Sequence, residues 1–225
     1  MNLLAIDSAC SILSIAVSHD EDLFYEQTEA GMKHSELVMD IINTQMEKAG
    51  LKPADLNGIL CMGGPGSFTG LRIGFSIAKG LALSLNIPFV PVPTLECIVY
   101  KTAGLTIPVI QARKDAFFFA LFEGGKRITG DTDGDVNQIA SVIREKLREN
   151  EKIAITGPAA DVLCNALPPE LKQSYEYSWK NTGYAKELIY IAKDKNLFYA
   201  DNTAFLYSGP EYIRKTDAEI NLLRN

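Results

Sequence analysis

Histidine is scarce in this sequence of 225 residues, which contains only His19 and His34. This pair cannot form the His-x-x-x-His or His-Glu-x-x-His spacing that is typical of zinc enzymes. A metal centre built on histidine is therefore not expected, and the sequence predicts no metal site and no cofactor. His34 stands at the start of a predicted helix, a position more typical of a surface residue than of a catalytic base.

Paired cysteines and long hydrophobic runs are also lacking. The four cysteines form no Cys-x-x-Cys pair, and three lie in or beside apolar runs, where a free thiol packs like a small hydrophobic side chain. The longest uncharged stretch, residues 80–95, contains three prolines and is too short to span a bilayer comfortably. No basic region precedes Asp7, so the N-terminus does not resemble a signal peptide. These absences predict a soluble, cytoplasmic protein with no membrane contact.

Positive charge is in deficit as well, because 22 basic residues face 28 acidic ones and the net charge is −6. No run of basic residues is longer than a pair. A protein that binds nucleic acid independently normally carries a basic patch, since neutralised phosphates supply most of its affinity. If this chain serves a reaction on RNA or DNA, we expect another subunit to hold the nucleic acid.

Apolar residues are arranged in a plan that occurs twice. In the first half we expect three strands, a helix, a strand, a helix and an edge strand with prolines, over residues 3–6, 12–17, 23–28, 34–49, 58–62, 70–85 and 88–92. Strands joined by such short links should be antiparallel. In the second half, strands are expected at 107–112, 116–122, 126–129, 152–156 and 173–178, and helices at 136–148, 161–167 and 182–195.

The repeated plan predicts an α/β protein of two lobes, residues 1–104 and 105–225. The sequence leaves open whether the 182–195 helix packs on the second lobe or returns to the first.

The most informative stretch is Gly-Gly-Pro-Gly-Ser-Phe-Thr-Gly-Leu-Arg-Ile-Gly, residues 63–74, where a buried strand turns into a helix. The start of a helix suits an anion. However, no Lys-Ser/Thr follows the last glycine as in a Walker loop, and Thr69 stands where the third glycine of Gly-x-Gly-x-x-Gly would be. The alternative is a turn that needs only glycine geometry, with Ser67 or Thr69 as the helix cap. Both interpretations stay open.

Small residues form a stripe along the helix after this turn, at Gly70, Gly74, Ala78 and Ala82. Larger apolar side chains flank the stripe, so the helix should be buried on more than one side. One side should pack on its own sheet, and the small stripe could let a partner chain approach closely. On that interpretation Gly74→Leu would abolish a complex and leave the fold largely intact. Tight packing wholly inside one lobe is the alternative.

Other candidate residues are few. Asp7 and Ser8 end a buried strand, where a carboxylate can reach a metal-bound nucleotide, although an Asp in an ordinary turn has the same pattern. Gly-x-Ser-x-Gly is absent, so no nucleophile elbow is indicated.

Residues 63–74, together with Ala-Lys-Gly-Leu-Ala at 78–82, resemble the signature of the TsaB (YeaZ) family, which takes part in making threonylcarbamoyladenosine in bacterial tRNA. Three shorter segments, 34–37, 111–115 and 212–214, also resemble the family, although Gln111 replaces its usual acidic residue. The resemblance implies the two-lobed actin, sugar-kinase and Hsp70 (ASKHA) fold, with duplicated ribonuclease-H-like lobes.

The resemblance also implies a subunit without catalytic residues. The related transferase TsaD holds its metal with two histidines of an Asn-His-Leu-Glu-Gly-His motif, and Thr94 and Ile98 stand at those positions here. For a nucleotide, only Asp7, Ser8 and Gly157 are candidates, and each is a weak match to the loops of the fold.

The implied partners are TsaD, bound through helices 34–49 and 70–85, and the nucleotide-binding TsaE, with tRNA contacted only indirectly. A homodimer through the same surface is expected when the chain is alone. The implied interface and signature residues are His34, Gly64, Pro65, Gly66, Ser67, Phe68, Thr69, Gly70, Arg72, Gly74, Ala78 and Ala82. The alternatives are an autonomous actin-type kinase or ATPase, which needs Asp7 to face a metal-bound nucleotide, and a peptidase.

Overall fold

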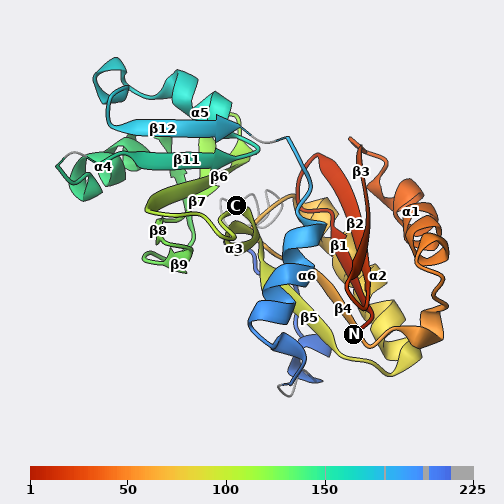
Figure 1. Ribbon diagram of the computed structural model, residues 1–225. Coiled ribbons are helices and arrows are strands. Elements are labelled where there is room, and N and C mark those ends of the chain that lie inside the picture. Colours follow the sequence, from red (N-terminus) through yellow and green to blue (C-terminus); the bar gives the residue numbers. More distant parts are fainter. Residues whose placement is uncertain (150, 180, 200–202, 214–225) are drawn as a thin grey trace.

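The structure is a computed structural model that describes residues 1–149, 151–179, 181–199 and 203–213. Its first lobe is built on a five-stranded sheet of order β3-β2-β1-β4-β5 (Figure 1). The strands are β1 (Leu3–Asp7), β2 (Ile12–His19), β3 (Asp22–Glu29), β4 (Gly58–Gly64) and β5 (Phe89–Pro93). β1, β2 and β3 are antiparallel neighbours, as predicted from their short links, whereas β4 and β5 run parallel to β1. The proline-containing strand β5 lies at the edge, where a missing N–H donor is tolerated, as predicted.

Helices cover both faces of this sheet, because alternate residues of each strand point to opposite sides. Leu4 and Ile6 pack with α1 (His34–Lys48) and α2 (Phe68–Leu85) on one face. Leu3 and Ala5 pack with α6 (Ala185–Asp194) on the other. β1 is therefore buried on both faces, in agreement with its continuous apolar sequence.

The second lobe repeats the arrangement with a sheet of order β10-β7-β6-β11-β12. Its strands are β6 (Leu105–Arg113), β7 (Ala116–Phe119), β10 (Thr132–Asp135), β11 (Ile153–Gly157) and β12 (Tyr175–Trp179), with β8 (Phe122–Glu123) and β9 (Lys126–Arg127) as a side hairpin. Helices α4 (Val136–Lys146) and α5 (Ala160–Ala166) pack on it. Short helical turns occur at Pro53–Asp55, Pro169–Leu171, Leu197–Tyr199 and Thr203–Leu206. Three antiparallel strands followed by two parallel ones in each lobe confirm the duplicated ribonuclease-H-like, ASKHA-type fold.

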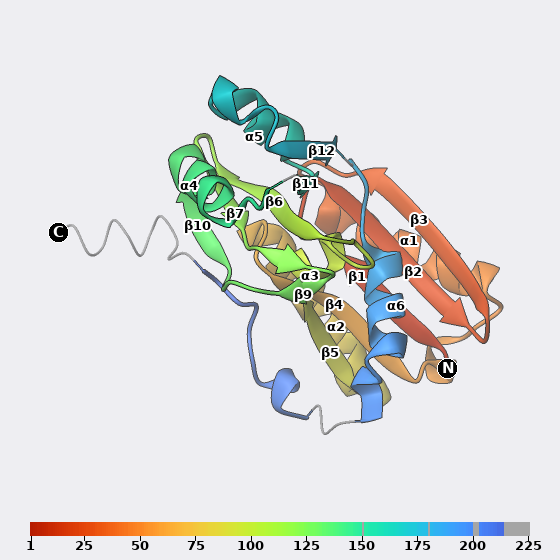
Figure 2. The same ribbon diagram turned by 60° about the vertical axis from the view of Figure 1, so that its left-hand side comes forward.

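The chain does not divide at residue 104 into two self-contained halves. Helix α6 follows the second sheet in sequence but packs on β1, β2 and β4 of the first lobe (Figures 1 and 2). The turn at Thr203–Leu206 then lies against β5. This placement answers the question that the sequence left open, because the helix within residues 182–195 returns to the first lobe. Thr182, where the 182–195 helix was expected to begin, lies before α6 and donates its hydroxyl to Gln27 Oε1 (2.9 Å).

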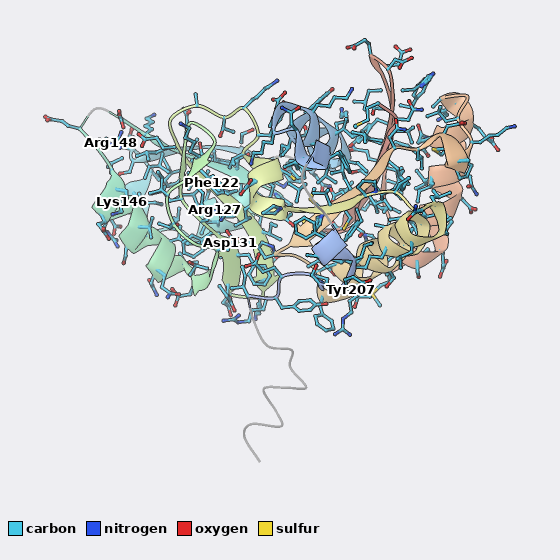
Figure 3. The ribbon with its side chains drawn as sticks, turned by 90° about the horizontal axis from the view of Figure 1, so that it is seen from below. Phe122, Arg127, Asp131, Lys146, Arg148 and Tyr207 are labelled. Atoms are coloured by element: carbon cyan, nitrogen blue, oxygen red, sulfur yellow. The ribbon has the colours of Figure 1, made fainter. Side chains whose placement is uncertain are left out.

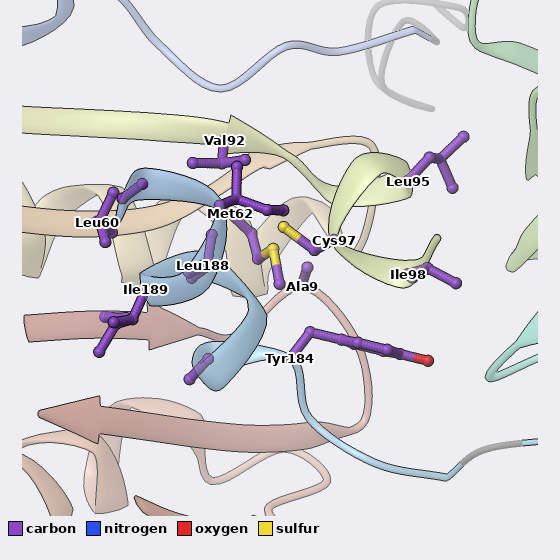
Figure 4. Packing of buried hydrophobic residues seen from close by; sticks show 14 of the residues in the cluster. Ala9, Leu60, Met62, Val92, Leu95, Cys97, Ile98, Tyr184, Leu188 and Ile189 are labelled. Carbon is purple, nitrogen blue, oxygen red and sulfur yellow. The ribbon is translucent and has the colours of Figure 1, made fainter. Parts of the chain in front are cut away.

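A shared core joins the lobes. Helix α3 (Thr94–Ile98) and helix α6 pack over Leu60 and Met62 of β4 (Figure 4). The second lobe adds Ile110 and Phe122 to this cluster. Because apolar side chains of both sheets are removed from water together, separating the lobes would expose them.

An ion cluster lies at the edge of the shared core (Figure 3). Arg127 stacks on Phe122, pairs with Asp131, and lies 3.6 Å from Glu96 of α3. Lys195, directly after α6, pairs with the same Glu96 (2.7 Å). The side hairpin of the second lobe is thereby tied to two helices of the first.

The small stripe of α2 is turned toward its own sheet. Ser67 caps the helix, accepting from the Gly70 amide (3.2 Å), and Ser8 donates its hydroxyl to the Gly70 carbonyl (2.8 Å). A Cβ atom added at Gly70 would lie 2.0 Å from the Ser8 carbonyl oxygen, and one at Gly74 would lie 2.6 Å from Ser8 Oγ. Ala78 and Ala82 are likewise buried. This placement corrects the expectation that the stripe meets a partner: a leucine at Gly74 would disrupt the lobe itself.

We expect Gly70→Ala to destabilise the protein by about 1–3 kcal/mol, because the methyl group overlaps backbone that cannot move aside without shifting α2. Gly80→Ala is the matched control, since nothing lies within 4 Å of a Cβ there. Alanine at this exposed helical position should stabilise by about 0.5–1 kcal/mol. Urea unfolding of both variants tests this. Equal changes in the free energy of unfolding for Gly70→Ala and Gly80→Ala would contradict the close contact between α2 and β1.

Candidate functional site

A cleft of about 660 Å³ lies between the lobes beside the signature turn. The turn and the start of α2 form one wall, and residues 110–112 and 158–159 of the second lobe form the opposite wall. The lining is completed by residues 9–11, Gly31, Met32, His34, Phe118 and residues 211–213. Of the expected site residues, the cleft brings together His34, Pro65, Gly66, Ser67, Phe68, Thr69 and Gly70.

The three candidate nucleotide residues do not line this cleft. Ser8 is buried and donates its hydroxyl to the Gly70 carbonyl. Gly157 has a φ of +109°, and a Cβ there would lie 2.6 Å from the Val109 carbonyl oxygen, so it serves the close packing of β11 on β6. Asp7 is likewise engaged inside the protein.

The carboxylate of Asp7 holds the start of α6 in place. One oxygen accepts from the Tyr184 amide (2.7 Å) and the other from the Ala9 amide (3.1 Å). Next to it, Ser14 Oγ accepts from the Ala185 amide (3.1 Å). An acidic group at the positive end of a helix is favourable. The chain's own amides therefore occupy the oxygens that an autonomous ATPase would direct at a metal-bound nucleotide.

Burial raises the pKa of Asp7 from 3.8 to about 6, and the two amide hydrogen bonds oppose this shift only in part. The folded chain keeps the proton between about pH 4 and pH 6, whereas the unfolded chain releases it. Stability is therefore expected to fall as the pH rises through this window, by about 2–3 kcal/mol.

Asp7→Asn should remove this pH dependence, because the amide does not titrate. Urea unfolding at intervals between pH 4.5 and pH 7 measures the difference between the wild-type and variant profiles. Asp115→Asn, at an exposed position, is the control and should leave the wild-type slope intact. Parallel profiles for Asp7→Asn and wild type would contradict the proposed titration.

His34 is buried, which corrects the prediction of a surface residue. Its Nε2 atom lies 3.0 Å from the Cys10 carbonyl oxygen and ties the start of α1 to the loop after β1. Burial raises the pKa of the Cys10 thiol well above its usual range. A cysteine nucleophile needs the thiolate, so this environment disfavours a Cys10–His34 peptidase pair. All four cysteines are free, as predicted.

The two positions at which the resemblance implies that metal-binding histidines are replaced lie in the packed core. Thr94 and Ile98 are both buried on α3. Ile98 packs beside Gly157, and Thr94 Oγ1 has no hydrogen-bond partner among the described residues. Within the same residues, no cluster of three or more His, Cys, Asp or Glu side chains could hold a metal ion.

The smaller family-like segments have distinct positions. Gln111 lines the cleft. Arg113 forms two hydrogen bonds with the Asp133 carboxylate (2.6 and 2.8 Å). The Glu211 amide donates to the Gly63 carbonyl (2.8 Å), and a Cβ at Gly64 would lie 2.4 Å from the Glu211 carbonyl oxygen. The segment before Tyr212 thus packs on the signature turn, whereas Arg214 lies outside the described residues.

A shallow groove runs along α2 and is bordered by Ser35 of α1. We call it the α1–α2 groove; its residues are Ser35, Phe68, Thr69, Arg72, Ile73, Ser76 and Ile77. Exposed apolar side chains stand on the same helices, with Met39 at 40% and Leu83 at 59% of full exposure. Sequence reasoning selected the small stripe and missed Ile73, Ser76 and Ile77. Ser76 lies on the helix face opposite the stripe. Ile73 and Ile77 lie on the flank of the helix, where they are partly buried against the core.

None of the helices in the described ranges combines the length and the apolar character that crossing a membrane requires.

Comparison with known proteins adds sequence and fold relationships. The family model of TsaD, described as tRNA N6-adenosine threonylcarbamoyltransferase, matches residues 25–222. The chain is 31% identical to the tRNA threonylcarbamoyladenosine biosynthesis protein TsaB of Bacillus subtilis, over 97% of this chain and 96% of that protein. It is 30% identical to the Escherichia coli TsaB over 55% of each chain. Among solved structures, YeaZ from Pseudomonas aeruginosa superposes with a TM-score of 0.78 at 18% identity, covering 94% of this chain and 99% of that one.

Proposed function

Because the chain belongs to the TsaB (YeaZ) family, we propose that it acts in tRNA threonylcarbamoyladenosine biosynthesis as a non-catalytic subunit. In this role it supports TsaD, which transfers a threonylcarbamoyl group from its adenylate to the adenosine beside the tRNA anticodon. TsaE joins the pair, and the complex works in the cytoplasm.

Three features support a role without catalysis by this chain. Thr94 and Ile98 are packed in the core at the positions where TsaD has histidines. Asp7 is engaged with backbone amides. The net charge of −6, without a long basic run, favours a subunit that leaves the tRNA to its partners.

The observation that carries the proposal is the α1–α2 groove, where apolar side chains remain at the surface between two helices. Exposed apolar groups that lie together are typical of protein interfaces. We propose that this groove and the outward faces of α1 and α2 contact TsaD. The buried stripe contributes indirectly, because it fixes α2 on its sheet. A homodimer through the same surface is expected when TsaD is absent.

Ser76→Trp tests the groove, since it places a bulky uncharged side chain at an exposed position in the middle of the expected interface. We expect affinity for the TsaD of the same organism to fall about tenfold or more. Ser141→Trp, at an exposed position of α4 in the second lobe, is the matched control and should bind normally. Calorimetric titration and size-exclusion chromatography of the mixture measure both.

Reconstitution of tRNA modification gives a second readout. The wild-type chain should be required together with TsaD and TsaE, and Ser76→Trp should lower the yield in step with its lost affinity. Unchanged binding by Ser76→Trp would contradict the proposed interface, and threonylcarbamoyl transfer by this chain without TsaD would contradict the non-catalytic role.

A further inference from the structure

Arg72 of α2 is held between two aromatic rings at one end of the α1–α2 groove. Its guanidinium carbon lies 3.8 Å from the centre of the Phe68 ring and 5.8 Å from that of Tyr212. The two rings are themselves in contact, with centres 4.9 Å apart. Arg72 Nε also donates to the Tyr212 hydroxyl oxygen (3.0 Å). A side chain that usually samples many rotamers is thus held in one orientation although it is exposed.

Arg72 has no carboxylate partner among the described residues, which sets it apart from the other arginines in that part of the chain. Each of those forms an ion pair: Arg113 with Asp133, Arg127 with Asp131, Arg144 with Glu170 and Arg148 with Glu123. This difference arises in a chain that has 28 acidic residues and a net charge of −6. The two Nη groups of Arg72, which form the fork that binds a carboxylate, therefore have no internal acceptor in the described structure.

The C-terminal segment provides the support. Tyr212 comes from the segment that returns to the first lobe, 140 residues beyond Arg72 in sequence. The other cation of α2, Lys79, donates to the Ser208 carbonyl oxygen of the same segment. Both charged side chains of α2 are thus fixed by residues 208–212, but only Arg72 also lines the α1–α2 groove.

We propose that Arg72 is the charged anchor of the α1–α2 groove, that it binds a carboxylate of the partner protein, and that Tyr212 is its positioning residue. The identification of that partner as TsaD rests on the proposed function. Arginine and aromatic residues together are typical of the few positions that dominate an interface. Because Phe68 and Tyr212 already restrict the guanidinium, binding costs less side-chain entropy than for a free arginine.

The surroundings favour an acidic side chain of a protein over a phosphate of RNA. The groove presents one cation beside Phe68, Ile73 and Ile77, whereas affinity for a nucleic-acid backbone requires several cations along a track. The expected contact is therefore a partner carboxylate next to apolar residues that cover the two isoleucines.

Affinity for TsaD, measured with Arg72→Gln, Arg72→Lys, Tyr212→Phe and the Arg72→Gln/Tyr212→Phe double variant, tests the proposal. Arg72→Gln should weaken binding about 10- to 100-fold and should flatten the loss of affinity that the wild type shows with rising salt. Arg72→Lys keeps the charge but loses the fork, so its affinity should lie between those of the wild type and Arg72→Gln. Tyr212→Phe keeps the ring and should weaken binding about 2- to 10-fold, but only while Arg72 is present.

Arg144→Gln on α4 is the control for loss of a surface arginine and should bind as the wild type does. Thermal unfolding of every variant should show that the fold is kept.

If Arg72→Gln binds TsaD with the affinity and salt dependence of the wild type, the role of Arg72 as an anchor is overturned. If Ser76→Trp still fails to bind in that case, the proposed interface survives without this role of Arg72. If Tyr212→Phe still lowers the affinity for TsaD in the Arg72→Gln background, the positioning role of Tyr212 is overturned. Weaker tRNA binding by the assembled complex, with TsaD affinity unchanged, would assign Arg72 to phosphate and also overturn the proposal.

Discussion

The close contact between the start of α2 and the end of β1 is the constraint on which the rest of this molecule depends. Gly70 and Gly74 leave no room for a side chain against Ser8, and the Ser8 hydroxyl closes the contact by donating to the Gly70 carbonyl. With one face of α2 held so tightly, its opposite face must point outward. The same contact sets the direction of the signature turn, which therefore forms one wall of the interlobe cleft.

Residues that the sequence marked as candidates for chemistry are used here for packing. The Asp7 carboxylate binds the amides of Tyr184 and Ala9, and Thr94 and Ile98 lie in the core that the two lobes share. A buried carboxylate needs hydrogen bonds wherever it lies, and backbone amides supply them without any ligand. This use in packing supports the proposal that the outer surface of α1 and α2 carries the function.

The return of the chain to its first lobe gives that surface its final form. Helix α6 covers the second face of the first sheet, and residues 208–212 then run past α2, where they hold Lys79 and Arg72. The last described residues thereby shape a surface whose main elements, α1 and α2, come from the first 85 residues. The ion cluster of Arg127, Glu96 and Lys195 links this returning part to the second lobe.

The sequence by itself determined most of the elements, their order and the duplicated plan, because apolar periodicity, proline positions and the Ser67 cap are set by residues close along the chain. It did not predict β10, and it joined β7 and β8 into one strand. The family signature likewise lies within one short segment. Tertiary structure alone decided which face of α2 meets the sheet, where α6 packs, that His34 is buried and that Tyr212 holds Arg72. Each of these depends on contacts between residues that are far apart in sequence, such as the 177 residues between Asp7 and Tyr184. Local spacing predicts that a helix has a small face, but only the packed chain determines what that face touches.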